Sequence, residues 1–198
     1  MKKDKINKEP LIYRFLYPGV MTLFKIIFRP TYYGKEHIPK EGHFVFAGNH
    51  IKFLDCLTVI GSTKRCVHFL AKAELFKYRI TNWFFNTAGI IPVHRERKDK
   101  AALDDAIKYL ENGCVVGLFP EGKVNKTEER LLPFKFGAVK MASETNSIVV
   151  PFSINGRYRP FRRSIDITFH KPTYIDPQSL AEENQRLYDI IYSGLREK

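Results

Sequence analysis

The sequence predicts an α/β domain with a mostly parallel, twisted sheet flanked by helices. From residue 43 onward, short apolar segments rich in β-branched and aromatic residues alternate with longer segments of helical periodicity, which is typical of βαβ units. The 198 residues fit one domain, and the 44% hydrophobic content supplies the apolar surface that a folded core needs. We therefore expect a single domain over residues 31–198, preceded by an N-terminal arm over residues 1–30.

The predicted strands are short, and most are apolar throughout, as parallel strands buried on both faces are. They comprise residues 43–49, 67–71, 90–93, 114–119 and 148–154. Residues 164–170 alternate between apolar and polar and predict an edge strand. Helices are predicted over residues 74–85 and 101–113, after Gly137, and from Ser179 to Leu195. Ser179 and Glu182 have the spacing of a capping box for the last helix.

The N-terminal arm combines basic and apolar residues. Residues 1–30 hold seven basic and two acidic residues, a net charge of +5. The apolar run over residues 11–28 includes Arg14 and Lys25 and is interrupted by Pro18-Gly19, whereas a spanning helix needs about 20 apolar residues. This pattern predicts one or two amphipathic helices lying in the surface of an anionic membrane. The alternative is an amphipathic helix packed on its own domain.

The whole chain carries a formal net charge of +12, which indicates a polyanionic partner, either nucleic acid or an anionic membrane. The segment GRYRPFRR (156–163) has the interleaved basic and aromatic residues that could hold phosphates, but no known RNA- or DNA-binding motif is present. We therefore expect a membrane partner and no nucleic acid. The three cysteines lie in apolar runs without metal-site spacing, which predicts buried free thiols and no metal site.

The first candidate site is the pair His50 and Asp55 in AGNHIKFLDCLTVI. His50 follows a predicted strand, and Asp55 falls in a helical pattern. On a regular helix, side chains five residues apart would point about 140° apart, so the two meet only if His50 lies in the loop before the helix. Asp55 could then bond one imidazole nitrogen and leave the other to accept a proton, as a general base does.

Two further groups of residues follow predicted strands. Glu121, Gly122 and Lys123 come after the strand at 114–119, and Arg95 follows the strand at 90–93. The cationic side chains suit phosphate, and a glycine lets backbone approach a ligand closely. Because the carboxyl ends of parallel strands share one edge of a sheet, these residues and His50 are expected on one rim.

Four sequence blocks resemble those of the glycerolipid acyltransferase family, which includes lysophosphatidate acyltransferase. NHIKFLD is similar to its NHxxxxD motif, LFPEG to its FPEG motif, GIIPVHR to its intermediate block and IVVPFSI to its apolar-Pro block, in family order. The resemblance implies an α/β fold, a thioester acyl donor (acyl-CoA or acyl carrier protein) and no metal or bound cofactor. It also implies a His50/Asp55 catalytic dyad, with Arg95, Glu121 and Gly122 around the acceptor.

The expected reaction is transfer of a fatty acyl group to 1-acylglycerol-3-phosphate, giving phosphatidic acid, at the cytoplasmic face of the cell membrane, with the enzyme peripheral or monotopic. One departure concerns the acceptor. The family usually continues FPEGTRS, whereas Lys123, Val124 and Asn125 follow Gly122 here, and Lys123 is expected to replace the missing arginine. The alternatives are another lysophospholipid acyltransferase, a tafazzin-like transacylase, and a silent lipid-binding protein, which the presence of both His50 and Asp55 disfavours.

Overall fold

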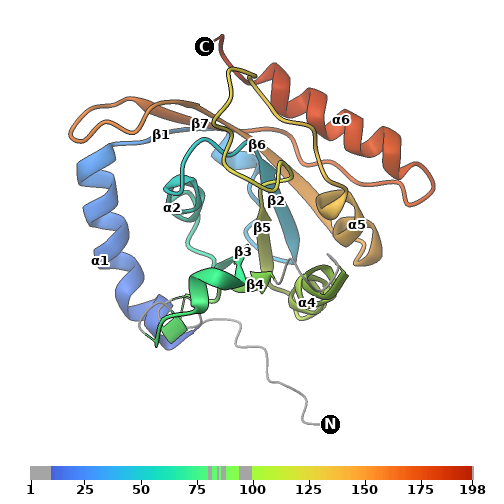
Figure 1. Cartoon of the computed structure of the whole chain (residues 1–198), viewed down its shortest axis with the longest axis horizontal. Coiled ribbons are helices and arrows are strands. Elements are labelled where there is room, and N and C mark those ends of the chain that lie inside the picture. Colours follow the sequence, from blue (N-terminus) through green and yellow to red (C-terminus); the bar gives the residue numbers. More distant parts are fainter. Residues whose placement is uncertain (1–9, 80–81, 84, 86–87, 94–99, 198) are drawn as a thin grey trace.

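A computed structural model describes residues 10–79, 82–83, 85, 88–93 and 100–197 (Figure 1). The strands are β1 (Thr31–Tyr33), β2 (Phe44–Gly48), β3 (Val67–Lys72), β4 (Ile91–Val93), β5 (Val115–Leu118), β6 (Ile148–Gly156) and β7 (Ile165–Phe169). The α-helices are α1 (Leu11–Phe28), α2 (Asp55–Ile60), α4 (Lys100–Glu111), α5 (Gly137–Glu144) and α6 (Leu180–Ser193). Two 3₁₀ helices, η1 (Lys35–His37) and η2 (Ala73–Phe76), complete the described elements.

The described strands form one sheet in the order β1-β7-β6-β2-β5-β3-β4. All neighbouring pairs are parallel except β6 and β7, which are antiparallel. The predicted mostly parallel α/β fold is therefore confirmed. β2 lies at the centre between β5 and β6, and each of its residues is buried.

Side chains along β2 alternate between two cores, because successive residues of a strand point to opposite faces. Phe44 and Phe46 pack under α1 and α2, in a core that also holds Phe152 and Phe169. Val45 and Ala47 face the other core, against α4, α5 and α6. Figure 1 shows the same arrangement, with α1 and α2 on one side of the sheet and α4 to α6 on the other.

The prediction that residues 164–170 form an edge strand was wrong. β7 is an inner strand, because β1 pairs with its outer edge in parallel, placing Tyr32 opposite Ile167. β1 is only three residues long, too short for a periodic pattern to reveal it.

Two helix predictions differ in detail. Ser179 is the N-cap of α6, but its side chain makes no capping hydrogen bond, and the helix ends at Ser193 rather than Leu195. The helix predicted over residues 74–85 begins as the 3₁₀ helix η2, and the described residues 79, 82, 83 and 85 are helical. The end of α4 agrees with the sequence, since Gly113 follows it with a φ of 80°.

α1 is one helix that continues through Pro18. Its inner face belongs to the core, where Met21 and Phe24 are buried. The Tyr13 hydroxyl donates to the Arg65 carbonyl (2.9 Å) and the Tyr17 hydroxyl to the Thr63 carbonyl (2.5 Å). The inner face of α1 therefore packs on the domain, as the alternative interpretation of the arm expected. Residues 1–9 of the predicted arm lie outside the described residues.

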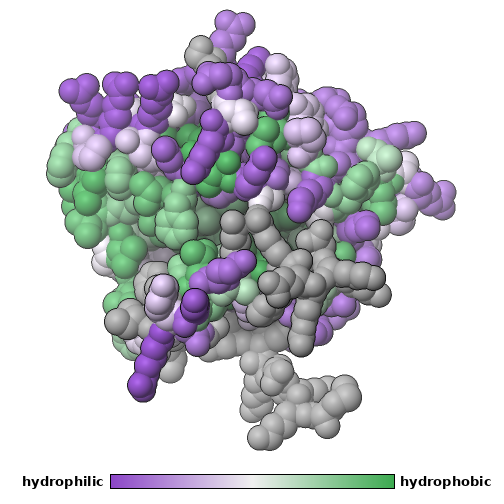
Figure 2. All heavy atoms as spheres, in the orientation of Figure 1, coloured by the Kyte–Doolittle hydropathy of each residue, from purple (hydrophilic) through white to green (hydrophobic). Residues whose placement is uncertain are grey.

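The outer face of α1 is apolar and exposed. It is formed by Phe15, Leu16, Val20, Leu23 and Ile26. In Figure 2 this face is a continuous hydrophobic area below a row of hydrophilic side chains. Among the described helices, none is long and apolar enough to cross a membrane.

Candidate active site

His50 and Asp55 meet at the carboxyl end of β2. His50 lies in the loop that leaves this strand and Asp55 is the first residue of α2, which is the strand-loop-helix geometry that the five-residue spacing requires. His50 Nδ1 lies 2.8 Å from Asp55 Oδ2. The Asp55 side chain is fully buried and that of His50 is 15% exposed. The contact uses Nδ1, so Nε2 is the nitrogen through which the ring could exchange a proton with a substrate.

The buried Asp55 carboxylate is surrounded by donors. Oδ2 also accepts hydrogen bonds from the Ile51 and Lys52 amides, both at 2.7 Å, and Oδ1 accepts one from the Tyr158 hydroxyl at 2.8 Å. A buried carboxylate without such partners would be strongly destabilising. The two amides come from the loop between His50 and Asp55, so the carboxylate also sets the shape of that loop.

The plane of the imidazole ring is set by Phe119, the aromatic residue of the LFPEG segment. The two rings are stacked, with centroids 3.9 Å apart and an interplanar angle of 7°. Phe119 in turn stacks on Phe69 of β3 at 5.4 Å. The ring of His50 therefore lies against a packed aromatic wall, which limits its rotation.

Backbone contacts hold His50 on both sides. Its amide donates to Glu121 Oε1 at 2.6 Å, and its carbonyl accepts from the Asn125 amide at 2.7 Å. The preceding Asn49 side chain bonds both the amide and the carbonyl of Ile154, at 2.7 and 2.9 Å, and so continues the pairing of β2 with β6 beyond the end of the strand. His50 is thereby tied to the loop after β5 and, through the neighbouring Asn49, to strand β6.

Glu121 joins two loops. Its Oε1 accepts the His50 amide, and its Oε2 accepts the Leu132 amide at 2.9 Å. Burial raises the pKa of Glu121, and these two amides act in the opposite direction. Both carboxylate oxygens thus accept hydrogen bonds from backbone amides, which satisfies the polar atoms of this buried side chain. A contact between Glu121 and the acceptor stays a prediction.

The remaining expected site residues follow Glu121 or lie elsewhere. Gly122 has a φ of 69°, and a Cβ there would stand 3.1 Å from Lys135 Cε, so the turn favours glycine. The Gly122 amide donates to the Phe119 carbonyl at 2.9 Å, which occupies it within the turn. Lys123 is exposed at the same rim. Arg95 lies outside the described residues.

Tyr158 is a site residue that sequence reasoning missed. It belongs to the segment 156–163, whose aromatic residues were interpreted only as part of a phosphate-binding loop. Its hydroxyl lies 2.8 Å from Asp55 Oδ1 and 2.7 Å from Thr58 Oγ1. Burial, and next the Asp55 charge, raises the pKa of Tyr158, so the phenol stays protonated and can donate. No local pattern links residues so far apart in sequence.

Of the three cysteines, Cys66 and Cys114 are buried and Cys56 is partly buried. Burial raises the pKa of the Cys56 thiol, and the neighbouring Asp55 raises it further, which opposes formation of a nucleophilic thiolate. Within the described ranges, no three His, Cys, Asp or Glu side chains are grouped as metal ligands.

Comparison with known proteins identifies relatives. The family model described as Acyltransferase matches residues 29–155. A 1-acyl-sn-glycerol-3-phosphate acyltransferase of Bacillus subtilis is 30% identical over 73% of this chain and 72% of its own length. One of Borreliella burgdorferi is 31% identical over 83% and 69%. The chain also superposes on the crystal structure of a 1-acyl-sn-glycerophosphate acyltransferase, PlsC, from Thermotoga maritima, with a TM-score of 0.70 and 23% identity. The superposition covers 93% of this chain and 89% of that one, so the two share a fold.

Replacing Glu121 by glutamine should destabilise the fold. The amide oxygen can accept only one of the two backbone donors, so a loss of about 1–3 kcal/mol is expected in urea unfolding at neutral pH. Because burial raises the pKa of Glu121 in the folded chain, the wild type should gain stability relative to Glu121→Gln as the pH falls from that raised value towards the ordinary glutamate value. The difference between the two proteins should therefore widen on acidification.

Glu128→Gln provides the matched control, since Glu128 is exposed in the same loop. It should change the unfolding free energy little at any pH. A difference between wild type and Glu121→Gln that narrows with falling pH would mean that the two amides outweigh burial and favour the ionised carboxylate.

Proposed function

We propose that this chain, which belongs to the acyltransferase family, transfers a fatty acyl group from a thioester to the free hydroxyl of 1-acylglycerol-3-phosphate. The observation that carries the proposal is the contact of a partly exposed His50 with a fully buried Asp55 at the carboxyl end of the sheet. The Bacillus subtilis and Borreliella burgdorferi relatives are 1-acyl-sn-glycerol-3-phosphate acyltransferases, which supports the choice of acceptor.

The reaction proceeds in one transfer without an acyl-enzyme. His50 Nε2 removes the proton of the acceptor hydroxyl as that oxygen attacks the thioester carbonyl carbon, and the Asp55 carboxylate stabilises the resulting imidazolium. When the carbon–sulfur bond breaks, the imidazolium returns the proton to the departing thiolate. An ester and a free thiol are the products. The thioester of coenzyme A or acyl carrier protein already activates the acyl group, so the step needs no resident cofactor.

Four neighbouring residues prepare the dyad for this step. The Tyr158 hydroxyl and the Ile51 and Lys52 amides keep the Asp55 carboxylate in one orientation. Phe119 holds the imidazole plane. Fixing these groups before the substrate arrives lowers the reorganisation that the transition state requires.

The acceptor phosphate is assigned to Lys123 and Arg95. Lys123 follows Gly122 in the loop after β5, and the Asn125 amide of this loop donates to the His50 carbonyl. Lys123 is exposed at this rim. Arg95 is assigned to the acceptor phosphate on the resemblance of GIIPVHR to the family block. A phosphomonoester dianion suits two cations.

The membrane partner is assigned to the outer face of α1. Phe15 is 78% exposed and Leu23 is 59% exposed, on a helix whose inner face packs against the domain. A solvated apolar face of this size favours insertion among lipid acyl chains, and the basic residues beside it favour anionic headgroups. We place the enzyme at the cytoplasmic face of the cell membrane as a peripheral or monotopic protein.

His50→Ala should abolish most turnover, because loss of a general base typically lowers the rate by about 10² to 10⁴. Asp55→Asn should also be severely impaired, since the amide cannot accept from the same set of donors and orient the ring. The measurement is thiol release from an acyl thioester mixed with 1-acylglycerol-3-phosphate, with circular dichroism to verify the fold. Near-normal thiol release by folded His50→Ala would remove the dyad assignment.

Lys123→Ala and Arg95→Ala should each raise the KM for 1-acylglycerol-3-phosphate. A charge-assisted hydrogen bond contributes roughly 1.5 to 3 kcal/mol, so kcat/KM should fall about tenfold or more. The loss should be smaller with a lysophospholipid whose phosphate is capped by choline. Lys126→Ala, an exposed lysine of the same loop, is the control.

Preference of the wild type for the choline-capped acceptor would favour the second candidate, another lysophospholipid acyltransferase or a tafazzin-like transacylase. The observation behind that candidate is the continuation of Gly122 by Lys123, Val124 and Asn125. Equal losses of both variants on both acceptors would also contradict the phosphomonoester assignment.

Phe15→Glu should weaken binding to vesicles of mixed anionic and zwitterionic lipid by about tenfold or more, since burying a large apolar side chain contributes about 1.5–3 kcal/mol. Activity on short-chain, water-soluble substrates should change much less. Tyr174→Glu is a matched control, because Tyr174 is an aromatic residue of similar exposure, 73%, outside α1. Equal weakening of vesicle binding by both substitutions would argue against insertion of this face.

A further inference from the structure

A cationic cavity lies where α1 ends and β1 begins. It has a volume of about 590 Å³ and is lined by Lys25, Ile26, Arg29, Pro30, Thr31, Tyr32 and Arg163. These residues come from the end of α1, the two residues that follow it, β1, and the loop between β6 and β7. None belongs to the loops after β2 and β5 that hold His50 and Lys123, so the cavity is separate from the lining assigned to the acceptor.

Two ammonium groups flank one aromatic ring at this cavity. Lys25 Nζ lies 5.8 Å and Lys35 Nζ 5.6 Å from the centroid of Tyr32. Burial lowers the pKa of Lys25, and the charge of Lys35 lowers it further. Within the described chain, the ion pairs involve other residues, so no carboxylate lies within 4 Å of the charged groups of Lys25, Lys35, Arg29 or Arg163. The clustered positive charge thus lacks a protein counterion in this part of the chain.

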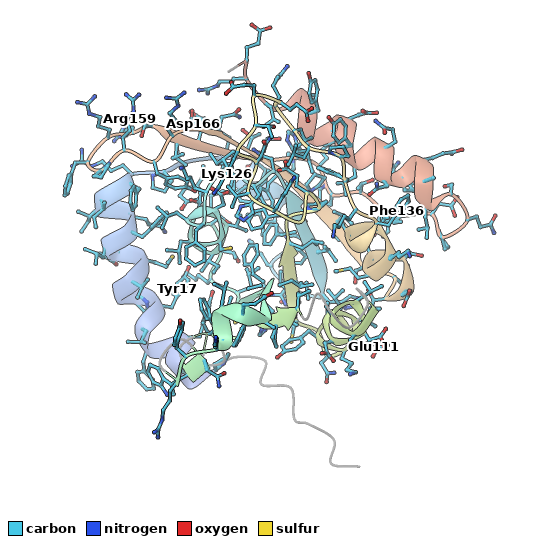
Figure 3. The ribbon with its side chains drawn as sticks, in the orientation of Figure 1. Tyr17, Glu111, Lys126, Phe136, Arg159 and Asp166 are labelled. Atoms are coloured by element: carbon cyan, nitrogen blue, oxygen red, sulfur yellow. The ribbon has the colours of Figure 1, made fainter. Side chains whose placement is uncertain are left out.

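The loop between β6 and β7 is anchored to the end of α1. The Phe161 amide donates to the Ile27 carbonyl at 2.5 Å, which brings Arg163 to the cavity that Arg29 lines. Figure 3 places the labelled Arg159 of this loop beside the same end of the helix. The carbonyl end of a helix tolerates nearby cations, because its dipole is negative there. The helix dipole therefore offsets part of the repulsion among these cations, and a bound anion would offset more of it.

The position of the cavity indicates where its anion comes from. Ile26 lines the cavity and also belongs to the exposed outer face of α1. An acyl chain beside that face would bring its phosphate to the level of Lys25 and Arg29. In Figure 2 the row of hydrophilic side chains borders the hydrophobic area in the same way that headgroups border acyl chains.

We propose that this cavity binds the phosphodiester group of an anionic phospholipid in the membrane, as a site distinct from the one that takes the acceptor. The inference rests on the membrane association proposed above. Arg29 and Arg163 supply planar donors for the phosphate oxygens, and Lys25 adds a mobile point charge. Free phosphate shares this chemistry, but it has no acyl chain to contact the apolar outer face of α1, to which Ile26 belongs.

The test uses the full chain and charge-matched variants. Arg29→Gln combined with Arg163→Gln removes two cations from the cavity. Arg14→Gln combined with Arg159→Gln removes two exposed cations from the same helix and the same loop, outside the cavity lining. Arg29 has a φ of 43°. Glutamine has a Cβ as arginine does, so the substitution removes the charge without changing the demand on the backbone there. Binding is measured by sedimentation with vesicles of phosphatidylcholine containing phosphatidylglycerol, and by calorimetry with inorganic phosphate alone.

The cavity variant should lose at least about tenfold more affinity for the anionic vesicles than the matched control, and the two should bind pure phosphatidylcholine vesicles alike. Equal losses on anionic vesicles would mean general surface charge and would overturn the site. The cavity variant could instead lose binding of inorganic phosphate while it and the matched control bind vesicles equally. That result would assign the cavity to soluble phosphate and overturn the lipid assignment. A raised KM for a water-soluble acceptor in the cavity variant would make the cavity part of the acceptor site.

Thiol release by the wild type on water-soluble substrates separates this inference from the proposed reaction. Thiol release without cavity-dependent vesicle binding would overturn only the lipid site. Cavity-dependent vesicle binding by a chain that releases no thiol would support the lipid site and contradict the reaction.

Discussion

The buried carboxylate of Asp55 is the constraint on which the arrangement of the rim depends. A charge removed from water must be offset by donors, and four converge on it, from the His50 ring, the Ile51 and Lys52 amides and the Tyr158 hydroxyl. These donors come from two segments of the chain. Satisfying one carboxylate therefore shapes the loop after β2, orients the imidazole and draws in the loop after β6.

The same network connects the site to α1. The rings of Phe28 and Tyr158 meet edge to face, with centroids 5.6 Å apart, and the Phe161 amide donates to the Ile27 carbonyl. Tyr158 thus touches both the last residue of α1 and the carboxylate beside His50. The helix proposed to contact the membrane and the carboxylate beside the proposed base thus share Tyr158 as a common contact.

The parts of the structure that could be predicted from the sequence are those with local signals. The buried strands show continuous apolar runs, and the five-residue spacing of His50 and Asp55 requires the loop that the structure contains. The parts that could not be predicted depend on contacts distant in sequence. β1 has three residues and is defined by its pairing with β7, Glu121 bonds amides of two separate loops, and Tyr158 reaches Asp55 across the fold. The capping box at Ser179 has a local signal, yet its side-chain bond is absent, because the motif permits that bond without requiring it.

α1 explains why one sequence pattern supported two interpretations, a helix packed on its own domain and a helix at a membrane surface. At 100° per residue its side chains fall into three sectors. The buried sector, within about 80°, holds Tyr13, Tyr17, Met21, Phe24 and Phe28. A second sector of about 140° holds the exposed apolar residues Phe15, Leu16, Val20, Leu23 and Ile26. Arg14 and Lys25 fall between them, so the helix has more apolar surface than the domain covers and a basic border along one side of that exposed apolar surface. Packing on the domain buries only the first sector. The apolar side chains of the second sector stay exposed, and a membrane surface is the partner proposed for them.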